Sequence, residues 1–285
     1  YKKGEIDMGI YLNPGFENFR RTLAAEIYVD KTMMIAEINK FIDRGNNYIC
    51  VSRPRRFGKT IAGNMLSAGT AKRAIVLVGD TAMRMGNPKD KSRGPLFGDS
   101  GTALALEYDP TANDIIIEFN TLGSGYQALM TPHGGYRHPV TQESFVEEDF
   151  GNGIIRAPKD ALINGMDVFS FAITKPAVSF KKMLEAQGLD KDNDVDYFLI
   201  HQANKLIVDR LVKKLKLPVE KVPYNLQEFG NLGGASILML MTSEIGKELS
   251  SRPLTLFCSS FGLGLTWGTM VLRTQPMKAL PLNKI

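Results

Sequence analysis

The sequence predicts an α/β fold, because short apolar runs alternate with segments whose apolar residues recur at helical spacing. The apolar runs are residues 74–78, 115–119, 198–200 and 254–258, and the helical segments are 176–187, 204–215 and 235–249. Residues 131–156 are rich in Gly, Pro and charge, which predicts a loop excursion, and a second half begins near Gly165 and Met166. With 285 residues, 44% of them hydrophobic, the chain can bury a large core.

Composition and charge exclude several classes of protein. No stretch reaches the roughly 18 to 20 apolar residues of a membrane helix, and the first residues lack a secretory core, so we expect a cytoplasmic protein. Cys50 and Cys258 form neither a disulfide framework nor a metal-ligand pattern. Residues 1–64 hold 11 Lys and Arg against 7 Asp and Glu, so the net charge of +5 is local and no nucleic-acid face is expected.

A phosphate-binding loop is predicted at residues 53–60, Arg-Pro-Arg-Arg-Phe-Gly-Lys-Thr, after a short buried strand at 48–52. Gly58, Lys59 and Thr60 fit the end of that motif, with Thr60 as a magnesium ligand, although Arg53 replaces its first glycine. With residues 9–14 and 28–31, this stretch resembles the start of a Bacteroidetes AAA-ATPase-like family, over about residues 8–64. Asp80 ends an apolar run as an ATPase acid would, but that run fits a central strand of the downstream fold better.

Three motifs in the second half outline a thioester site. They are centred on His201 within residues 196–204, Asn231 within 230–236, and Gly264 within 261–268. With residues 67–80, 97–103 and 166–172, they resemble ketoacyl-acyl carrier protein synthase III, of the thiolase-like superfamily, over about residues 65–285. The resemblance implies a layered α/β/α/β/α fold of two similar halves, the first of them incomplete. We therefore expect a fusion of residues 1–64, a P-loop fragment, with a first half at 65–165 and a second half at 166–285.

The resemblance assigns chemical roles. In this family a cysteine at a helix N-terminus takes the acyl group, and a histidine and an asparagine stabilise the enolate formed when malonyl-acyl carrier protein loses carbon dioxide. His201 and Asn231 match that pair, and the backbone of Gly264 matches the site for the acyl carbonyl oxygen. A buried core histidine, a turn asparagine and a strand-connecting glycine are the structural alternatives. His133 and His138 match no such position and are expected at the surface.

The nucleophile is the missing part of this pattern. Its position falls near Ser52, a much weaker nucleophile without a dedicated base, while Cys50 lies two positions away and Cys258 is expected to be a core thiol. Asn204 and Lys205 fall where the family binds its carrier or coenzyme A, but Leu206 replaces an arginine there.

Three functions follow as expectations. The first is a synthase III-like acyltransferase of fatty-acid-type biosynthesis, without a cofactor, whose substrates and partners are acyl-CoA and malonyl-acyl carrier protein. The resemblance also implies a homodimer with residues 74–78 near its two-fold axis. The alternatives are a protein that binds Mg-ATP through Gly58, Lys59 and Thr60, and a fusion product without catalysis.

Overall fold

The computed structural model describes residues 62–63, 65–94 and 96–282. The chain divides into two compact units, one of residues 1–77 with 104–109 and the other of residues 78–103 with 110–285. The expected P-loop fragment lies almost entirely outside the described residues, so the division at residues 64 and 165 stays a prediction.

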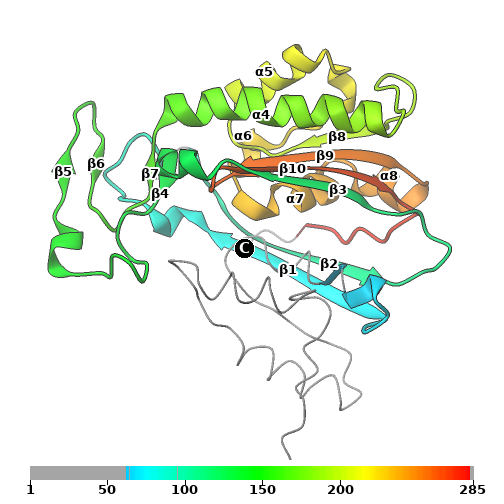
Figure 1. Cartoon of the computed structure of the whole chain (residues 1–285), viewed down its shortest axis with the longest axis horizontal. Helices are drawn as coiled ribbons and strands as arrows, with labels where there is room; N and C mark the ends of the chain where they lie inside the picture. The colour runs from blue at the N-terminus through cyan, green and yellow to red at the C-terminus, as the bar shows by residue number, and fades with distance from the viewer. Residues whose placement is uncertain (1–61, 64, 95, 283–285) are drawn as a thin grey trace, which may run out of the picture. The chain divides into compact units, whose positions relative to one another are not determined.

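A four-stranded sheet forms the centre of the second unit (Figure 1). Its strands lie in the order β3 (Ile116–Thr121), β10 (Thr266–Arg273), β9 (Thr255–Gly262) and β8 (Tyr197–Ile200). Strands β8 and β9 are parallel, with Ile200 opposite Ser259, and the other neighbours are antiparallel. The apolar runs predicted at 115–119, 198–200 and 254–258 therefore all belong to this sheet, as their β-branched and aromatic residues indicated.

Helices cover both faces of this sheet. Helices α4 (Gly165–Ala186) and α5 (Lys205–Leu215) lie over one face, and α7 (Ser236–Ser243) and α8 (Gly246–Ser251) lie over the other (Figure 1). The helix predicted from residue 176 in fact begins at Gly165, capped by Asn164, and Pro176 lies inside it. An interior proline costs about 3 kcal/mol. Buried residues on both sides of it, Ala172 and Ala177 among them, show that packing outweighs this cost.

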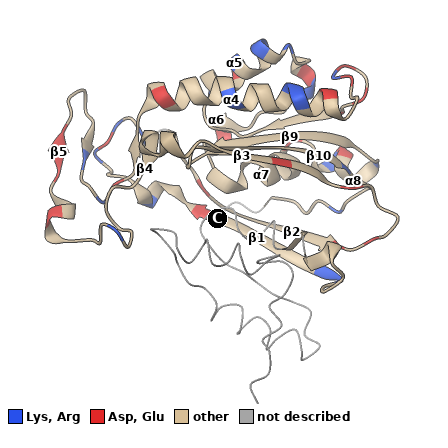
Figure 2. Cartoon of the chain, in the orientation of Figure 1, with Lys and Arg blue, Asp and Glu red and all other residues tan. Residues whose placement is uncertain are grey.

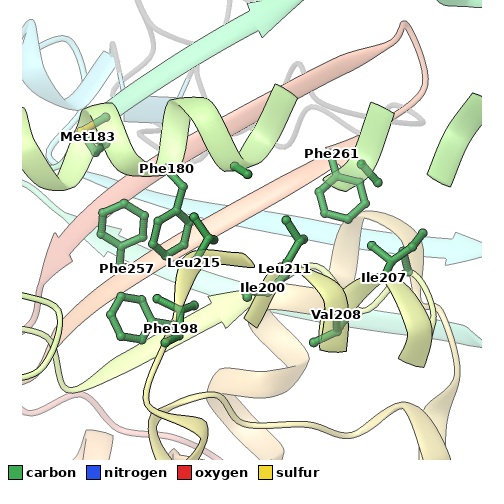
Figure 3. Packing of buried hydrophobic residues seen from close by; sticks show 14 of the residues in the cluster. Phe180, Met183, Phe198, Ile200, Ile207, Val208, Leu211, Leu215, Phe257 and Phe261 are labelled. Atoms are coloured by element: carbon green, nitrogen blue, oxygen red, sulfur yellow. The ribbon is translucent and has the colours of Figure 1, made fainter. Parts of the chain in front are cut away.

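The largest core cluster lies between the sheet and helices α4 and α5 (Figure 3). The ring of Phe180 on α4 packs 4.2 Å from that of Phe257 on β9 and 5.6 Å from that of Phe198 on β8, measured between centroids. Phe171 meets Trp267 edge to face at 5.7 Å. A second cluster on the other face joins Leu199 and Cys258 to helices α7 and α8, so the prediction that Cys258 is a core thiol is confirmed.

Two predicted segments differ from the structure in detail. The single helix expected at 235–249 is divided, with α7 ending at Ser243 and α8 starting at Gly246. The excursion at 131–156 contains only a short 3-10 turn, Gln142–Phe145, and a pair of two-residue antiparallel strands, β5 (Glu148–Asp149) and β6 (Ile155–Arg156). It is therefore a loop with little regular structure, as its Gly, Pro and charge content predicted.

The remaining elements are two further pairs of strands, one short helix and several 3-10 turns. They comprise strands β1 (Arg73–Thr81) and β2 (Asp99–Glu107), which pair; β4 (Leu129–Met130) and β7 (Leu162–Ile163), which also pair; helix α6 (Leu226–Phe229); and the 3-10 turns η1 (Ala82–Met85), η2 (Gly123–Ala128), η4 (Val219–Lys221) and η5 (Gly233–Ala235). Strand β1 contains the run predicted at 74–78. None of the helices within the described ranges is long and apolar enough to cross a membrane.

Candidate active site

His201 lies directly beyond the carboxyl end of β8. Its backbone N–H donates to the carbonyl oxygen of Ser259 on the parallel strand β9 at 2.8 Å, which continues the ladder by one residue. In open α/β sheets, ligands bind beyond the carboxyl ends of parallel strands, so His201 occupies such a place. The residue is only 7% exposed, and its ring packs edge to face on Phe261 at 5.3 Å between centroids.

Asn231 is held at both its backbone and its side chain. Its N–H donates to the carbonyl of Leu96 at 2.8 Å, and its own carbonyl accepts from Gly98 at 3.2 Å, which forms an isolated parallel bridge. Its Oδ1 accepts from the backbone N–H of Gly233 at 3.0 Å. Because that contact needs an acceptor, it fixes the amide orientation and leaves the Nδ2 group as the donor.

One serine links the two residues. The hydroxyl of Ser236, the first residue of α7, lies 3.1 Å from Nδ1 of His201 and 3.1 Å from the carbonyl oxygen of Gly233. The carbonyl oxygen of Gly233 also accepts from the backbone N–H of Ser236, and the N–H of Gly233 holds Asn231, so a continuous set of contacts runs from His201 to Asn231. The structure therefore brings the predicted histidine and asparagine to one turn.

Glycine at position 233 is required by its surroundings. Its φ of +56° is in the left-handed region, and a Cβ there would lie 2.7 Å from Oδ2 of Asp80. Asp80, which sequence reasoning considered only as an ATPase acid, therefore lies against the turn that carries Asn231. Nothing in the sequence pairs Asp80 with that turn, because the two are distant along the chain.

Gly264 lies in the turn between β9 and β10. Its φ is +137°, and a Cβ would lie 2.5 Å from Cγ2 of Thr266, so this position also requires glycine. The next residue, Leu265, exchanges two backbone hydrogen bonds with Leu122 at 2.8 and 3.1 Å. The same turn follows Phe261, which packs on His201, and a role for Gly264 at the site stays a prediction.

The residues after His201 have structural partners. Asn204 is the N-cap of α5, where its Oδ1 accepts from the N–H of Ile207 at 2.8 Å. Lys205 lies 3.1 Å from the carboxylate of Asp209 and 5.2 Å from the ring centroid of Tyr224. Along α4 and α5, acidic and basic side chains are interspersed rather than of one sign (Figure 2). A carrier-binding role for Asn204 and Lys205 stays a prediction.

His133 and His138 belong to the loop at residues 131–156, and five further predicted residues lie outside the described part of the chain. Ser52, Cys50, Gly58, Lys59 and Thr60 fall outside the described residues. His138 is exposed, as predicted, but His133 is half-buried, because its Nδ1 lies 2.9 Å from the hydroxyl of the buried Ser144. Among the described residues, no group of three or more His, Cys, Asp and Glu side chains could hold a metal ion.

Family comparisons agree with this geometry. Residues 57–125 match the family described as 3-oxoacyl-[acyl-carrier-protein (ACP)] synthase III, and residues 184–274 match its C-terminal counterpart. These segments belong to the synthase III family. The beta-ketoacyl-[acyl-carrier-protein] synthase III of Streptococcus gordonii is 31% identical over 217 residues, which cover 75% of this chain and 63% of the relative.

Solved structures confirm the predicted thiolase-like α/β class. A crystal structure of 3-oxoacyl-(acyl-carrier-protein) synthase III superposes with a TM-score of 0.72 at 26% identity, covering 76% of this chain and 65% of the other. The 3-oxoacyl-(acyl-carrier protein) synthase of Burkholderia xenovorans gives a TM-score of 0.70 at 31% identity, covering 79% and 62%. The chain thus spans somewhat less than two thirds of these relatives.

A different family matches the first part of the chain. Residues 14–74 match a family described as predicted AAA-ATPase, and this match overlaps the synthase match over residues 57–74. Two unrelated families therefore meet in one chain, which supports the interpretation of a fusion.

Proposed function

We propose that this chain carries the decarboxylating half of 3-oxoacyl-acyl carrier protein synthase III chemistry, an acyltransferase reaction. The observation that carries the proposal is the set of contacts that joins His201 to Asn231: the Ser236 hydroxyl lies at Nδ1 of His201, the Ser236 backbone N–H donates to the carbonyl oxygen of Gly233, and the Gly233 N–H donates to Asn231. In this proposal Nε2 of His201, beyond the end of a parallel strand, and Nδ2 of Asn231, in the adjoining turn, are the two donors. Membership of the matched segments in the synthase III family supports the same reaction.

In the proposed reaction the bond between the malonyl carboxylate carbon and the α-carbon breaks, and carbon dioxide leaves. The electron pair moves onto the thioester carbonyl oxygen, giving an enolate. Nε2–H of His201 and Nδ2–H of Asn231 donate to that oxygen, where negative charge appears only as the bond breaks. In the full condensation the enolate carbon then attacks an acyl group held on the enzyme, and the enzyme nucleophile leaves.

The acyl-holding step is the one we propose to be impaired. Cys258 is buried in β9 within the second core cluster and is not placed to take an acyl group, which leaves Ser52 and Cys50 as the candidates. The partners in this proposal are acyl-CoA and acyl carrier protein, contacted near Asn204 and Lys205. The proposal needs no cofactor and places the protein in the cytoplasm.

Decarboxylation of malonyl-CoA tests the proposal, because this step needs the two donors but no acyl-enzyme; the enolate carbon then takes a proton from water and acetyl-CoA is the product. We expect slow release of carbon dioxide by the purified chain, and a loss of about 10²–10³ in rate for His201→Ala or Asn231→Ala. His138→Ala is the matched control, because it removes an exposed imidazole far from the motifs, and it should leave the rate unchanged. Equal rates in all four proteins, or no release at all, would instead support the non-catalytic fusion product.

Intact mass spectrometry after incubation with acetyl-CoA tests the acyl-holding step separately. An impaired nucleophile predicts no stable adduct. A stable increase by one acetyl group, mapped to a peptide with Ser52 or Cys50, would contradict the impairment and restore the full condensation to the proposal.

A second candidate function is binding of Mg-ATP, which the AAA-ATPase match at residues 14–74 favours. Gly58 and Lys59 would hold the phosphates and Thr60 the magnesium ion. ATP with magnesium should raise the melting temperature of the chain, and Lys59→Ala should abolish the rise while the exposed-lysine control Lys181→Ala keeps it. An unchanged melting temperature in the parent chain would exclude this function.

A homodimer is also proposed. Strand β1 exposes Ile75 and Leu77 on one side, at 50% and 56%, while Val76 on the other side is buried. An apolar strand face of this kind is typical of a contact with another chain. Light scattering should give the mass of a dimer, and Leu77→Lys should shift it to that of a monomer. A monomeric mass for the unmodified chain would contradict the proposal.

A further inference from the structure

Ser236 makes two contacts that compete for one proton. Its hydroxyl lies 3.1 Å from Nδ1 of His201 and 3.1 Å from the carbonyl oxygen of Gly233. A serine hydroxyl carries a single hydrogen, so it can donate to only one of these atoms at a time. The choice determines which nitrogen of the neutral imidazole carries the ring proton. If the hydroxyl donates to Gly233, Nδ1 must be protonated to keep its contact, and Nε2 then has no proton to give.

The surroundings of the two acceptors differ. The carbonyl oxygen of Gly233 already accepts from the backbone N–H of Ser236 at the start of α7. A separation of 3.1 Å is also longer than the usual 2.5–3.0 Å of an O–H···O bond. If the hydroxyl points away from Gly233, the carbonyl oxygen therefore still has the backbone N–H as its donor. His201 is only 7% exposed, and in such surroundings a hydrogen bond from the hydroxyl to Nδ1 contributes more than a second hydrogen bond to the carbonyl oxygen of Gly233.

We propose that Ser236 is a positioning residue that donates its hydroxyl proton to Nδ1 of His201 and so keeps the imidazole in the Nε2–H form. In this arrangement the histidine is a hydrogen-bond donor while neutral. The inference rests on the proposed function, which requires a donor at Nε2 for the enolate oxygen. It also explains how the Asn231 turn and the histidine act together, since α7 begins at the residue that orients the imidazole.

The packing of His201 agrees with a fixed ring. Phe261 meets the imidazole edge to face with an interplanar angle of 81°, and the backbone of His201 is tied to Ser259 on β9. The aromatic contact restricts the ring plane but does not distinguish the two nitrogens. Ser236 supplies that distinction, because its hydroxyl lies at Nδ1.

Nitrogen NMR of the full chain labelled with ¹⁵N-histidine tests this assignment directly, since the sequence has only 3 histidines. We expect the His201 resonances, assigned by their loss in His201→Ala, to show a pyridine-type Nδ1 and a pyrrole-type Nε2 at neutral pH. In Ser236→Ala the two shifts should move toward each other as the tautomers mix. Ser236→Thr keeps a hydroxyl and should retain the parent shifts.

A matched control comes from the second serine–histidine pair of the chain. The Ser144 hydroxyl lies 2.9 Å from Nδ1 of His133, away from the proposed site. Ser144→Ala should change the His133 resonances and leave those of His201 as they are. A pyrrole-type Nδ1 in the parent chain, or His201 shifts unchanged by Ser236→Ala, would overturn the proposal.

Kinetics separate this inference from the proposed function. Ser236→Ala should lower kcat for malonyl-CoA decarboxylation about five- to tenfold, the worth of one hydrogen bond, with KM unchanged and with recovery in Ser236→Thr. A parent chain with the expected shifts but without decarboxylation would reject the proposed function and keep the role of Ser236 at His201. Should Ser236→Ala fail to fold, the parent shifts and those of Ser236→Thr still decide, because a pyrrole-type Nδ1 in either contradicts the assignment.

Discussion

The indole N–H of Trp267 on β10 donates to the hydroxyl oxygen of Ser179 on α4 at 2.7 Å. The same oxygen lies 3.3 Å from Nδ2 of Asn120 on β3, so one serine joins two neighbouring strands to the helix above them. Ser179 is buried, and a polar contact of this kind fixes how the helix lies on the sheet.

Ser179→Ala should therefore lower the free energy of unfolding by about 1–3 kcal/mol, because it leaves the indole N–H without its acceptor. Urea denaturation followed by tryptophan fluorescence measures this, and the single tryptophan of the chain is the reporter itself. The control is Ser170→Ala, an exposed position on the same helix, for which a change within about 0.5 kcal/mol is expected. Equal effects of the two substitutions would contradict the role of Ser179.

Phe180 packs within a group of three aromatic rings in the main core. It contacts both Phe198 and Phe257, and all three side chains are almost completely buried (Figure 3). We expect Phe180→Ala to cost about 3–5 kcal/mol, from lost burial and from the cavity left behind. Val178→Ala, on the exposed side of the same helix, should cost far less. Chemical denaturation at equilibrium measures both variants. Similar midpoints for Phe180→Ala and Val178→Ala would contradict the importance of Phe180 in the core.

The buried carboxylate of Asp90 gives a pH dependence to stability. Burial raises its pKa, but hydrogen bonds from Ser92 and from Arg156, whose Nε lies 2.6 Å from Oδ2, outweigh that and hold the pKa below its ordinary 3.8. Because the pKa of Asp90 is lower in the folded state, its ionised carboxylate stabilises the folded chain fully above pH 3.8. This stabilisation is lost as the pH falls through the pKa that Asp90 has in the folded state.

We therefore expect the difference in unfolding free energy between the parent chain and Asp90→Asn to be largest near neutral pH and to shrink below about pH 4. Thermal or urea denaturation across this range measures it. Asp114→Asn, at an exposed position, should show no such dependence. A difference that is constant with pH would mean that the contacts with Ser92 and Arg156 do not lower the pKa of Asp90.

The turn at Gly233 should be sensitive to a single methyl group. Gly233→Ala places a Cβ 2.7 Å from Asp80 and forces alanine into a φ of +56°. A non-glycine residue in this conformation costs about 1–3 kcal/mol. Because the same residue holds Asn231, decarboxylation should fall more than stability alone explains. Gly135→Ala is the control, because a Cβ there has open space. Equal decarboxylation rates in the two variants would mean that the turn at Gly233 does not affect catalysis.

The sequence was sufficient for elements whose signal is local. The strands at β8 and β9 follow from short apolar runs and α5 follows from its helical spacing, whereas the cap formed by Asn204 became clear only from the structure. The start of α4 was missed because Pro176 usually marks the first turn of a helix rather than its middle. There, burial on both sides of the proline outweighs local propensity.

The site shows the same contrast. His201 and Asn231 were identified from motifs that are continuous in the chain, and the structure adds what joins them. Ser236 lies within one of those motifs, but its contact with His201 spans 35 residues and depends on where α7 begins relative to β8. The approach of Asp80 to Gly233 is longer in range still. Such contacts are set by packing of the layers, for which no local pattern exists.

The position of Cys258 has a practical consequence. Its thiol lies on the face of β9 that helices α7 and α8 cover, in the second core cluster, so a thiol-reactive reagent can reach it only when this packing opens. The labelling rate of Cys258 in a Cys50→Ser background would therefore measure, without denaturant, how often this part of the core opens. Cys258 can therefore report on local opening of the core without an added label site.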